Sequence, residues 1–194
     1  MTLRPRVAGV DFSGARDAGK HIWVAEGTPT PDGVRIDSLR RADTLPRSGP
    51  DFDDAMPGLC AHIATLTDSI VGFDFPFSIP APLIEQSTWP VFIRDFADRY
   101  ATPEEFRETC RSLTGGRELK RETDIEAKVP WCAYNLRLYR QTWAGIRHVL
   151  APLVSRNFAR IIPIQPPKDG LTVIAEICPA SFLKREGLYF PYKG

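Results

Sequence analysis

The stretch IVGFD, residues 70–74, is a short apolar run that ends on an acid. Two other stretches have the same form, VAGVD at residues 7–11 and LTVIAE at residues 171–176. The acids at the ends of the three runs are Asp11, Asp74 and Glu176. Runs of this length predict buried strands, and neighbouring strands lie about 4.8 Å apart. Strands that end at the same level of one sheet would therefore gather these carboxylates in one place.

The three carboxylates are the candidate metal ligands of the chain. A single acid at a strand end is commonly a turn former or a helix cap. Three acids in register repel one another, and a divalent cation relieves that repulsion. Because hard cations such as Mg²⁺ and Mn²⁺ prefer oxygen ligands, the pattern predicts a Mg²⁺ or Mn²⁺ site formed by Asp11, Asp74 and Glu176.

The order of apolar runs and chain breakers predicts an α/β fold built on a mixed sheet. The first three strands suit antiparallel hairpins, and short connections place the first strand beside the fourth. The last two strands are expected to form a further hairpin, followed by a short helix that Gly187 ends. The expected strands are residues 5–11, 21–27, 33–40, 69–75, 159–164 and 171–176, and the expected helices include residues 51–66 and 180–186.

Size and composition favour one domain. The chain has 194 residues, is 43% hydrophobic and carries a formal net charge of +1, which suits one substantial core with an insertion. No apolar run approaches the roughly 20 residues of a membrane span, so we expect a soluble, cytoplasmic protein with no membrane partner. The four cysteines are widely spaced and form no CxxC pair, so we expect no zinc site.

Three motifs resemble a known family of predicted nucleases, domain of unknown function 429. The motifs are GVDFSGA at residues 9–15, GFDFPFSIP at residues 72–80 and AEICPASFL at residues 175–183. The resemblance implies a ribonuclease H-like sheet with strand order 3-2-1-4-5, spanning residues 1–194 with a helical insertion at about 90–158. The family pattern has a further helix carrying another aspartate, and that final helix is expected to be absent here.

The same resemblance implies a metal-dependent nuclease that hydrolyses phosphodiester bonds of nucleic acid. In that family arrangement Asp11, Asp74 and Glu176 would be the catalytic and metal-binding residues. Two cations about 3.5 to 4 Å apart would activate water and stabilise the leaving oxygen, with Asp11 bridging them.

The charge pattern supplies a second indication of a nucleic-acid partner. The 42 residues between Glu126 and Asp169 contain seven bases and no acid. Leu136, Tyr139, Trp143, Ile146 and Leu150 recur at helical spacing and predict a core-facing stripe. Arg137, Arg140 and Arg147 follow on a neighbouring face and could hold a phosphate backbone, although a solvated face is the other interpretation. Arg121 and Asp124 are further candidate site residues.

Two alternatives use the same residues differently. Residues 14–20, GARDAGK, match part of a nucleotide-binding P-loop, but His21 follows in place of Ser or Thr, and the next residues predict a strand instead of a helix. Ser13 and Lys20 would suit the phosphate-binding hairpin of an actin-like or sugar-kinase-like phosphotransferase, and we include both among the candidate substrate-binding residues. A non-catalytic binding module with structural acids is the remaining alternative.

Overall fold

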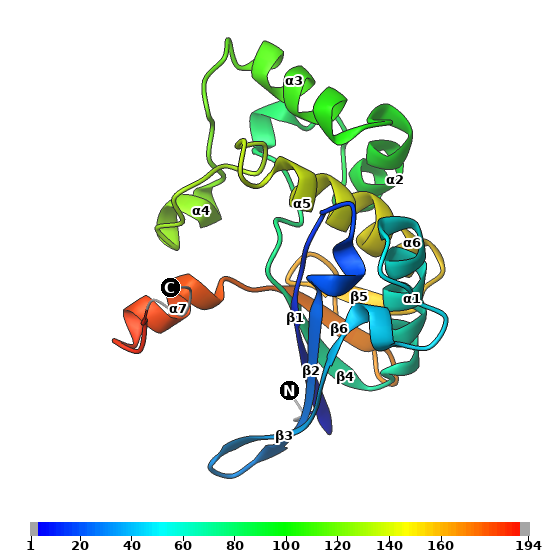
Figure 1. The fold of residues 1–194 in the computed structure, drawn as a ribbon. Helices are drawn as coiled ribbons and strands as arrows, with labels where there is room; N and C mark the ends of the chain where they lie inside the picture. The colour runs from blue at the N-terminus through cyan, green and yellow to red at the C-terminus, as the bar shows by residue number, and fades with distance from the viewer. Residues whose placement is uncertain (1–3, 191–194) are drawn as a thin grey trace.

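The computed structural model describes residues 4–190 of the chain (Figure 1). Its strands are β1 (Arg6–Asp11), β2 (Trp23–Thr30), β3 (Gly33–Arg41), β4 (Ser69–Phe73), β5 (Ala159–Ile162) and β6 (Thr172–Glu176). Its α-helices are α1 (Phe52–Thr65), α2 (Trp89–Arg99), α3 (Pro103–Leu113), α4 (Glu122–Glu126), α5 (Tyr139–Gly145), α6 (Ala151–Ser155) and α7 (Pro179–Arg185). A π-helical turn, η4 (Ile146–Leu150), joins α5 to α6, and 3-10 turns lie at η1 (Ala18–Lys20), η2 (Ala42–Thr44) and η3 (Ala81–Leu83).

The strands form one mixed sheet in the order β3-β2-β1-β4-β6-β5. β1, β2 and β3 pair antiparallel, as the hairpin turns predicted. β4 lies parallel to β1 and also parallel to β6. The α/β class and the placement of the first strand beside the fourth are therefore confirmed.

The predicted hairpin between the last two strands is wrong, and so is the five-strand order 3-2-1-4-5. The sheet has six strands, and β5 lies at its edge, beyond β6 and parallel to it. At the turn after β5, the Gln165 side chain accepts from the Ile161 amide at 3.0 Å, and the Gln165 amide donates to the Ile161 carbonyl at 2.7 Å. Arg4 then holds the returning segment by donating to the carbonyls of Lys168 and Leu171.

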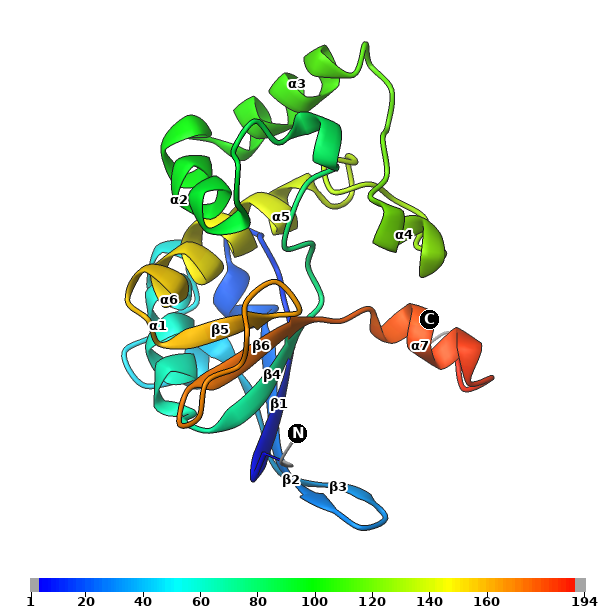
Figure 2. The ribbon, with the colours of Figure 1, turned by 180° about the vertical axis from the view of Figure 1, so that it is seen from behind.

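Alternation along the strands divides the sheet into two unlike faces. Val10, Val24 and Phe73 are buried on one face and belong to the same core cluster as Leu59 and Ile63 of α1. Figures 1 and 2 both show α1 and α6 on that side, while α7 extends away from the body of the protein. We refer to the opposite side of the sheet, which no described helix covers in these views, as the open face.

The helix that crosses the carboxyl edge of the sheet differs from its expected form. Tyr139, Ile146 and Leu150 are buried as predicted, but Leu136 is 66% exposed because α5 begins only at Tyr139. The π-turn lies just before Pro152, which has no amide to donate to the His148 carbonyl. That carbonyl instead accepts the Cys60 thiol of α1 at 3.0 Å, which fastens the crossing helix to α1.

Two glycines allow a direct test of how tightly this helix packs. A Cβ at Gly145 would lie 2.3 Å from the buried Phe75 ring, whereas a Cβ at Gly9 would meet no atom within 4 Å. We expect Gly145→Ala to destabilise the protein by about 1 to 3 kcal/mol, because the ring has little room to move. Gly9→Ala should change the free energy of unfolding by less than about 0.5 kcal/mol. Urea denaturation of both variants measures the difference, and equal effects would contradict this packing.

Candidate functional site

Asp11 and Asp74 lie together where two adjacent parallel strands end. Val10 of β1 pairs with Phe73 of β4, so the next residue along each strand is one of the two aspartates. Asp74 is half-buried, and its Oδ1 accepts a hydrogen bond from the Phe12 amide at 2.8 Å. The prediction that the ends of these strands bring Asp11 and Asp74 together is confirmed.

The pair has an unusual protonation equilibrium. Burial and the negative charge of Asp11 raise the pKa of Asp74 to about 6, against the opposing effect of the hydrogen bond from the Phe12 amide. Two carboxylates this close favour a shared proton or a cation. The site can therefore act in proton transfer near neutral pH or hold a positive ion.

Gln141 of α5 completes this edge, and sequence analysis did not single it out. Its Nε2 donates to the Phe12 carbonyl at 2.9 Å and lies 3.5 Å from Asp74 Oδ1. A Cβ at Gly14 would lie 2.5 Å from the Arg140 carbonyl, so glycine is what lets the loop after β1 approach α5. A lone glutamine on a helix gives no sequence signal for this role, because only the crossing of α5 over β1 creates it.

Glu176 has a different set of partners from the two aspartates. Arg121 binds it with both terminal nitrogens, at 2.8 and 2.5 Å, and the Phe77 amide donates to it at 2.9 Å. Arg121 also binds Asp124 of α4 at 2.5 Å. The sequence candidates Arg121, Asp124 and Glu176 thus come together as an ion cluster, which we call the Arg121 clamp.

The donor set at the edge suits a hard cation with few protein ligands. Within residues 4–190, no group of three or more His, Cys, Asp or Glu side chains is arranged to hold a metal ion. Asp11 and Asp74 supply two carboxylates, and Mg²⁺ is commonly bound by one or two carboxylates with water and substrate phosphate completing its shell. The residues present therefore fit such an ion at Asp11 and Asp74, while the Glu176 carboxylate is already neutralised by Arg121.

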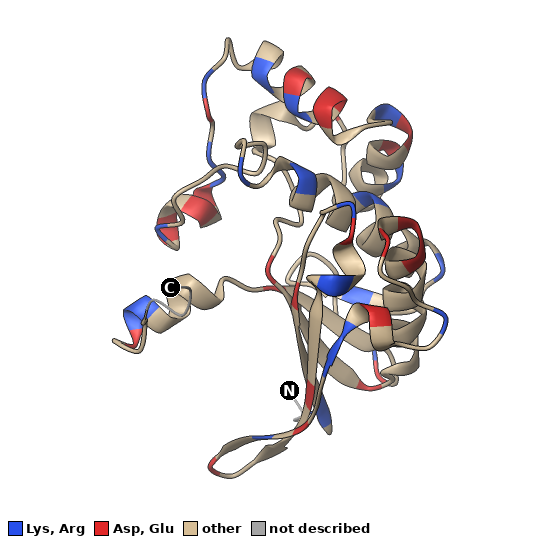
Figure 3. Ribbon diagram, viewed as in Figure 1, with Lys and Arg blue, Asp and Glu red and all other residues tan. Residues whose placement is uncertain are grey.

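The three predicted phosphate-binding arginines do not form one free row. Arg147 donates to the carbonyls of Ala97 and Tyr100 at the end of α2, and Arg140 pairs with Glu104 of α3 at 2.5 Å. Arg137 precedes α5 and stacks on the Trp131 ring at 5.2 Å. Figure 3 shows acids on α3 among the bases of this region, so the acid-free stretch of sequence is not an acid-free surface.

The loop after β1 does not have the form of a P-loop. Residues 18–20 form the 3-10 turn η1 and lead into β2, with no α-helix opening at the loop. Lys20 is exposed, and Ser13 Oγ accepts from the Ala15 amide at 3.3 Å. Neither residue has a contact with the Asp11–Asp74 pair in the described hydrogen bonds, so their predicted substrate contacts stay untested.

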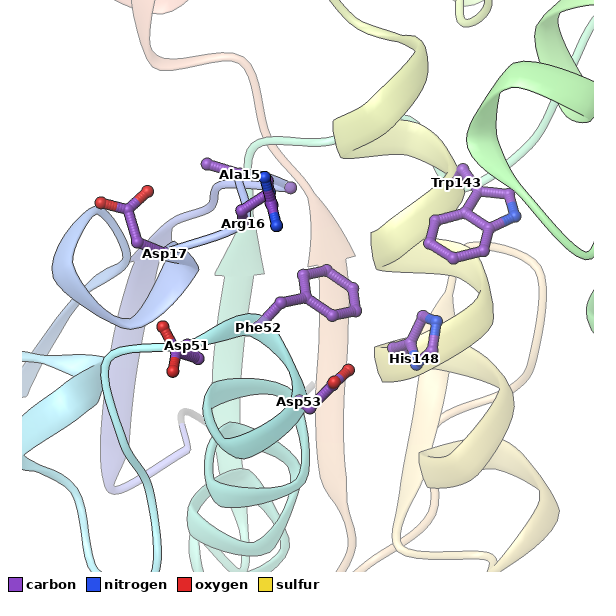
Figure 4. Close-up of a pocket in the computed structure, with 9 residues that line it drawn as sticks. Ala15, Arg16, Asp17, Asp51, Phe52, Asp53, Trp143 and His148 are labelled. Atoms are coloured by element: carbon purple, nitrogen blue, oxygen red, sulfur yellow. The ribbon is translucent and has the colours of Figure 1, made fainter.

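A cavity lies on the α1 side of the sheet (Figure 4). It has a volume of about 680 Å³ and lies between the loop after β1, the start of α1 and the helix that crosses the edge. Figure 4 shows the rings of Phe52, Trp143 and His148 at one side and Asp17 and Asp51 at the other. Burial and the neighbouring charge of Arg147 lower the pKa of His148 to about 4, so its imidazole is neutral at pH 7.

The Arg121 clamp is expected to fasten α4 to the sheet. Two of its three members are largely removed from water, since the side chains of Arg121 and Asp124 are 12% and 5% exposed, while that of Glu176 is 33% exposed. Removing one partner leaves buried charge uncompensated, so Arg121→Ala should destabilise the protein by about 2 to 4 kcal/mol. It should also speed cleavage by trypsin at Lys120 and Lys128, which flank α4. Urea denaturation and a digestion time course measure the two effects.

Arg140→Ala is the matched control for the clamp. The Arg140–Glu104 pair has the same 2.5 Å separation, but both side chains are more than half exposed, and exposed pairs contribute about 1 kcal/mol or less. Equal losses of stability in the two variants would show that the clamp does not anchor α4.

Comparisons with known proteins add no identification. No protein-family model, curated protein or solved structure matches this chain. Among the described residues, none of the helices is both long and apolar enough to cross a bilayer.

Proposed function

We propose that the protein is a metal-dependent phosphodiesterase of the ribonuclease H-like type that acts on nucleic acid. The observation that carries the proposal is the juxtaposition of Asp11 and Asp74 at the ends of two adjacent parallel strands. The mixed sheet, with three antiparallel strands followed by parallel ones, is compatible with that fold although it has an added edge strand. The resemblance of the three sequence motifs points the same way.

Asp11 and Asp74 would hold Mg²⁺ or Mn²⁺. Such a cation would supply a bound water of lowered pKa and charge stabilisation for an in-line displacement at phosphorus. The Phe12 amide keeps Asp74 oriented toward the edge, and Gln141 closes the side of the site next to the Phe12 carbonyl. These contacts leave the Asp11 carboxylate exposed to an incoming phosphate and its ions.

Arg121 would have a positioning role. Its side chain is only 12% exposed and is held by Asp124 of α4 and by Glu176 on β6, the strand beside β4, so it would fix the helical insertion at the strand ends. Glu176 then serves to position Arg121. This role replaces direct metal ligation by Glu176 as our proposal for that residue.

One observation favours a non-catalytic binding module as the second candidate. Arg121 already pairs with the third acid, Glu176, so the edge lacks the third carboxylate of the expected metal site and its acids would be structural. The two candidates differ in whether a covalent bond is broken.

The deciding experiment is a cleavage assay with four end-labelled substrates: single-stranded RNA, single-stranded DNA, duplex DNA and an RNA–DNA hybrid. Each is incubated with the protein and Mn²⁺, Mg²⁺ or EDTA, and bis(p-nitrophenyl) phosphate serves as a small diester. Cleavage that requires the cation supports the proposal. Retention of labelled strands on the protein without cleavage under every condition would favour the binding module.

A further inference from the structure

The open face of the sheet carries an apolar patch, which ends at Asp11 and Arg41 beside Trp23. Opposite residues on antiparallel strands point to the same side, and the pairs Ala25–Leu39 and Gly27–Ile36 lie on the side away from α1. Ile36 and Leu39 are each 61% exposed, and Trp23 on the same side is 40% exposed. Contiguous exposed apolar side chains on a sheet mark an interaction surface.

The centre of the open face is shallow. Ala25, Gly9, Gly72 and Ala175 stand side by side on four neighbouring strands. Ile177 covers Gly72, where its Cδ1 lies 2.8 Å from the ideal Cβ position, but the space above Gly9 is empty to 4 Å. A row of small residues flanked by Trp23 and Leu39 on one side and Ile177 on the other leaves room for large side chains from another element.

The C-terminal segment carries side chains that match this hollow. Phe182 of α7 is 52% exposed, and Tyr189 and Phe190 just beyond the helix are also exposed. No residue of α7 is buried. Figures 1 and 2 both show α7 extending away from the sheet.

We propose that the protein forms a homodimer in which residues 179–190 of each copy lie on the open face of the other. This inference does not depend on the nuclease proposal. The side chains of Trp23, Phe182, Tyr189 and Phe190 are 40 to 62% exposed. Each of these four rings presents on the order of 100 Å² of apolar surface. With Ile36, Leu39 and Ile177 added, each chain offers several hundred Å² of apolar surface, which approaches the roughly 800 Å² per partner of a stable interface.

The start of the segment favours a second copy over the chain's own sheet. The Ile177 amide donates to the Phe73 carbonyl at 2.8 Å, which fixes Ile177 beside β4. Pro179 begins α7 only two residues later. Figures 1 and 2 show α7 projecting clear of the sheet from this fixed point, so a second copy can receive it as it stands.

Sedimentation equilibrium of the full chain between about 1 and 100 μM tests the proposal. We expect the wild type to sediment at twice the mass of one chain, and Leu39→Glu and Phe182→Glu each to weaken the dimer about 30-fold or more. Leu136→Glu is the matched control, because Leu136 is equally exposed but lies in the helical region. Circular dichroism and urea denaturation confirm that the exposed substitutions leave the fold intact.

Mixing the two variants separates this arrangement from other dimers. A mixture of Leu39→Glu and Phe182→Glu still allows one intact contact, between the wild-type segment of the first and the wild-type face of the second. Partial recovery of dimer in the mixture, and none in either variant alone, is the expected result. A monomeric wild type at 100 μM, or a dimer that neither variant weakens, would overturn the proposal.

Discussion

Replacing Asp11 by Asn is expected to abolish both the binding of Mn²⁺ and the cleavage of nucleic acid while the fold persists. Asp11 is exposed at the end of β1, so the isosteric amide leaves packing unchanged. It removes one of the two charges that would hold the cation. A bound cation contributes several kcal/mol to transition-state stabilisation, so turnover should fall on the order of a thousandfold or more.

Calorimetric titration of Mn²⁺ at pH 7.5 measures this effect directly, and unfolding in urea confirms that the variant is folded. Asp53→Asn is the matched control, because Asp53 is an exposed aspartate in the cavity on the α1 side. Binding that survives Asp11→Asn but disappears in Asp53→Asn would move the cation to that cavity. Mn²⁺ binding that survives both substitutions would show that the Asp11–Asp74 pair is not the cation site.

The strands could be predicted from sequence more readily than their directions. Alternation and turn residues identified β1 to β4, and the buried run at residues 70–74 required a central position. The run 171–176 also had the composition of a strand, but its partner's direction depends on contacts that are distant in sequence. Arg4 binds the carbonyl of Leu171, 167 residues away, and no local pattern reports such a contact.

The candidate site was predictable where backbone geometry alone determines it. Asp11 and Asp74 meet because parallel neighbours end together, which a strand pattern can show. Glu176 pairs with Phe73 and so lies one residue short of the two aspartates, and its partner Arg121 lies 55 residues away on the insertion. Sequence analysis marked Arg121 as a candidate without indicating that it neutralises Glu176.

The side chains of the predicted basic face have partners within the protein, for a related reason. Helical spacing places Arg140 and Arg147 on one side of a helix, but it does not report what packs there. The end of α2 places free carbonyls next to Arg147, and α3 places Glu104 next to Arg140. Long polar side chains next to another helix form hydrogen bonds or ion pairs with groups of that helix, and these contacts compete with ligand binding.

Asp74→Asn is expected to stabilise the protein above pH 6 in the absence of divalent cations. The same substitution should abolish cation binding. Burial and the Asp11 charge raise the pKa of Asp74 from 3.8 to about 6. Below about pH 4 the carboxyl is protonated in both the folded and unfolded chains. Between pH 4 and pH 6 only the folded chain keeps the proton, so the wild type loses stability as pH rises through this window. Above pH 6 the loss is complete, at most about 3 kcal/mol by 1.36 kcal/mol per unit.

The measurement is the free energy of unfolding of wild type and Asp74→Asn in urea at intervals from pH 4 to pH 8, without divalent cations. The difference between them should grow between pH 4 and pH 6 and then stay constant, since the amide does not titrate. In Asp11→Asn the growth should be smaller, because one cause of the raised pKa is gone. A difference independent of pH would mean that Asp74 is already ionised at pH 4. Adding Mn²⁺ at pH 7.5 should stabilise the wild type and not Asp74→Asn, because the charge that destabilises the folded chain is the charge that binds the ion.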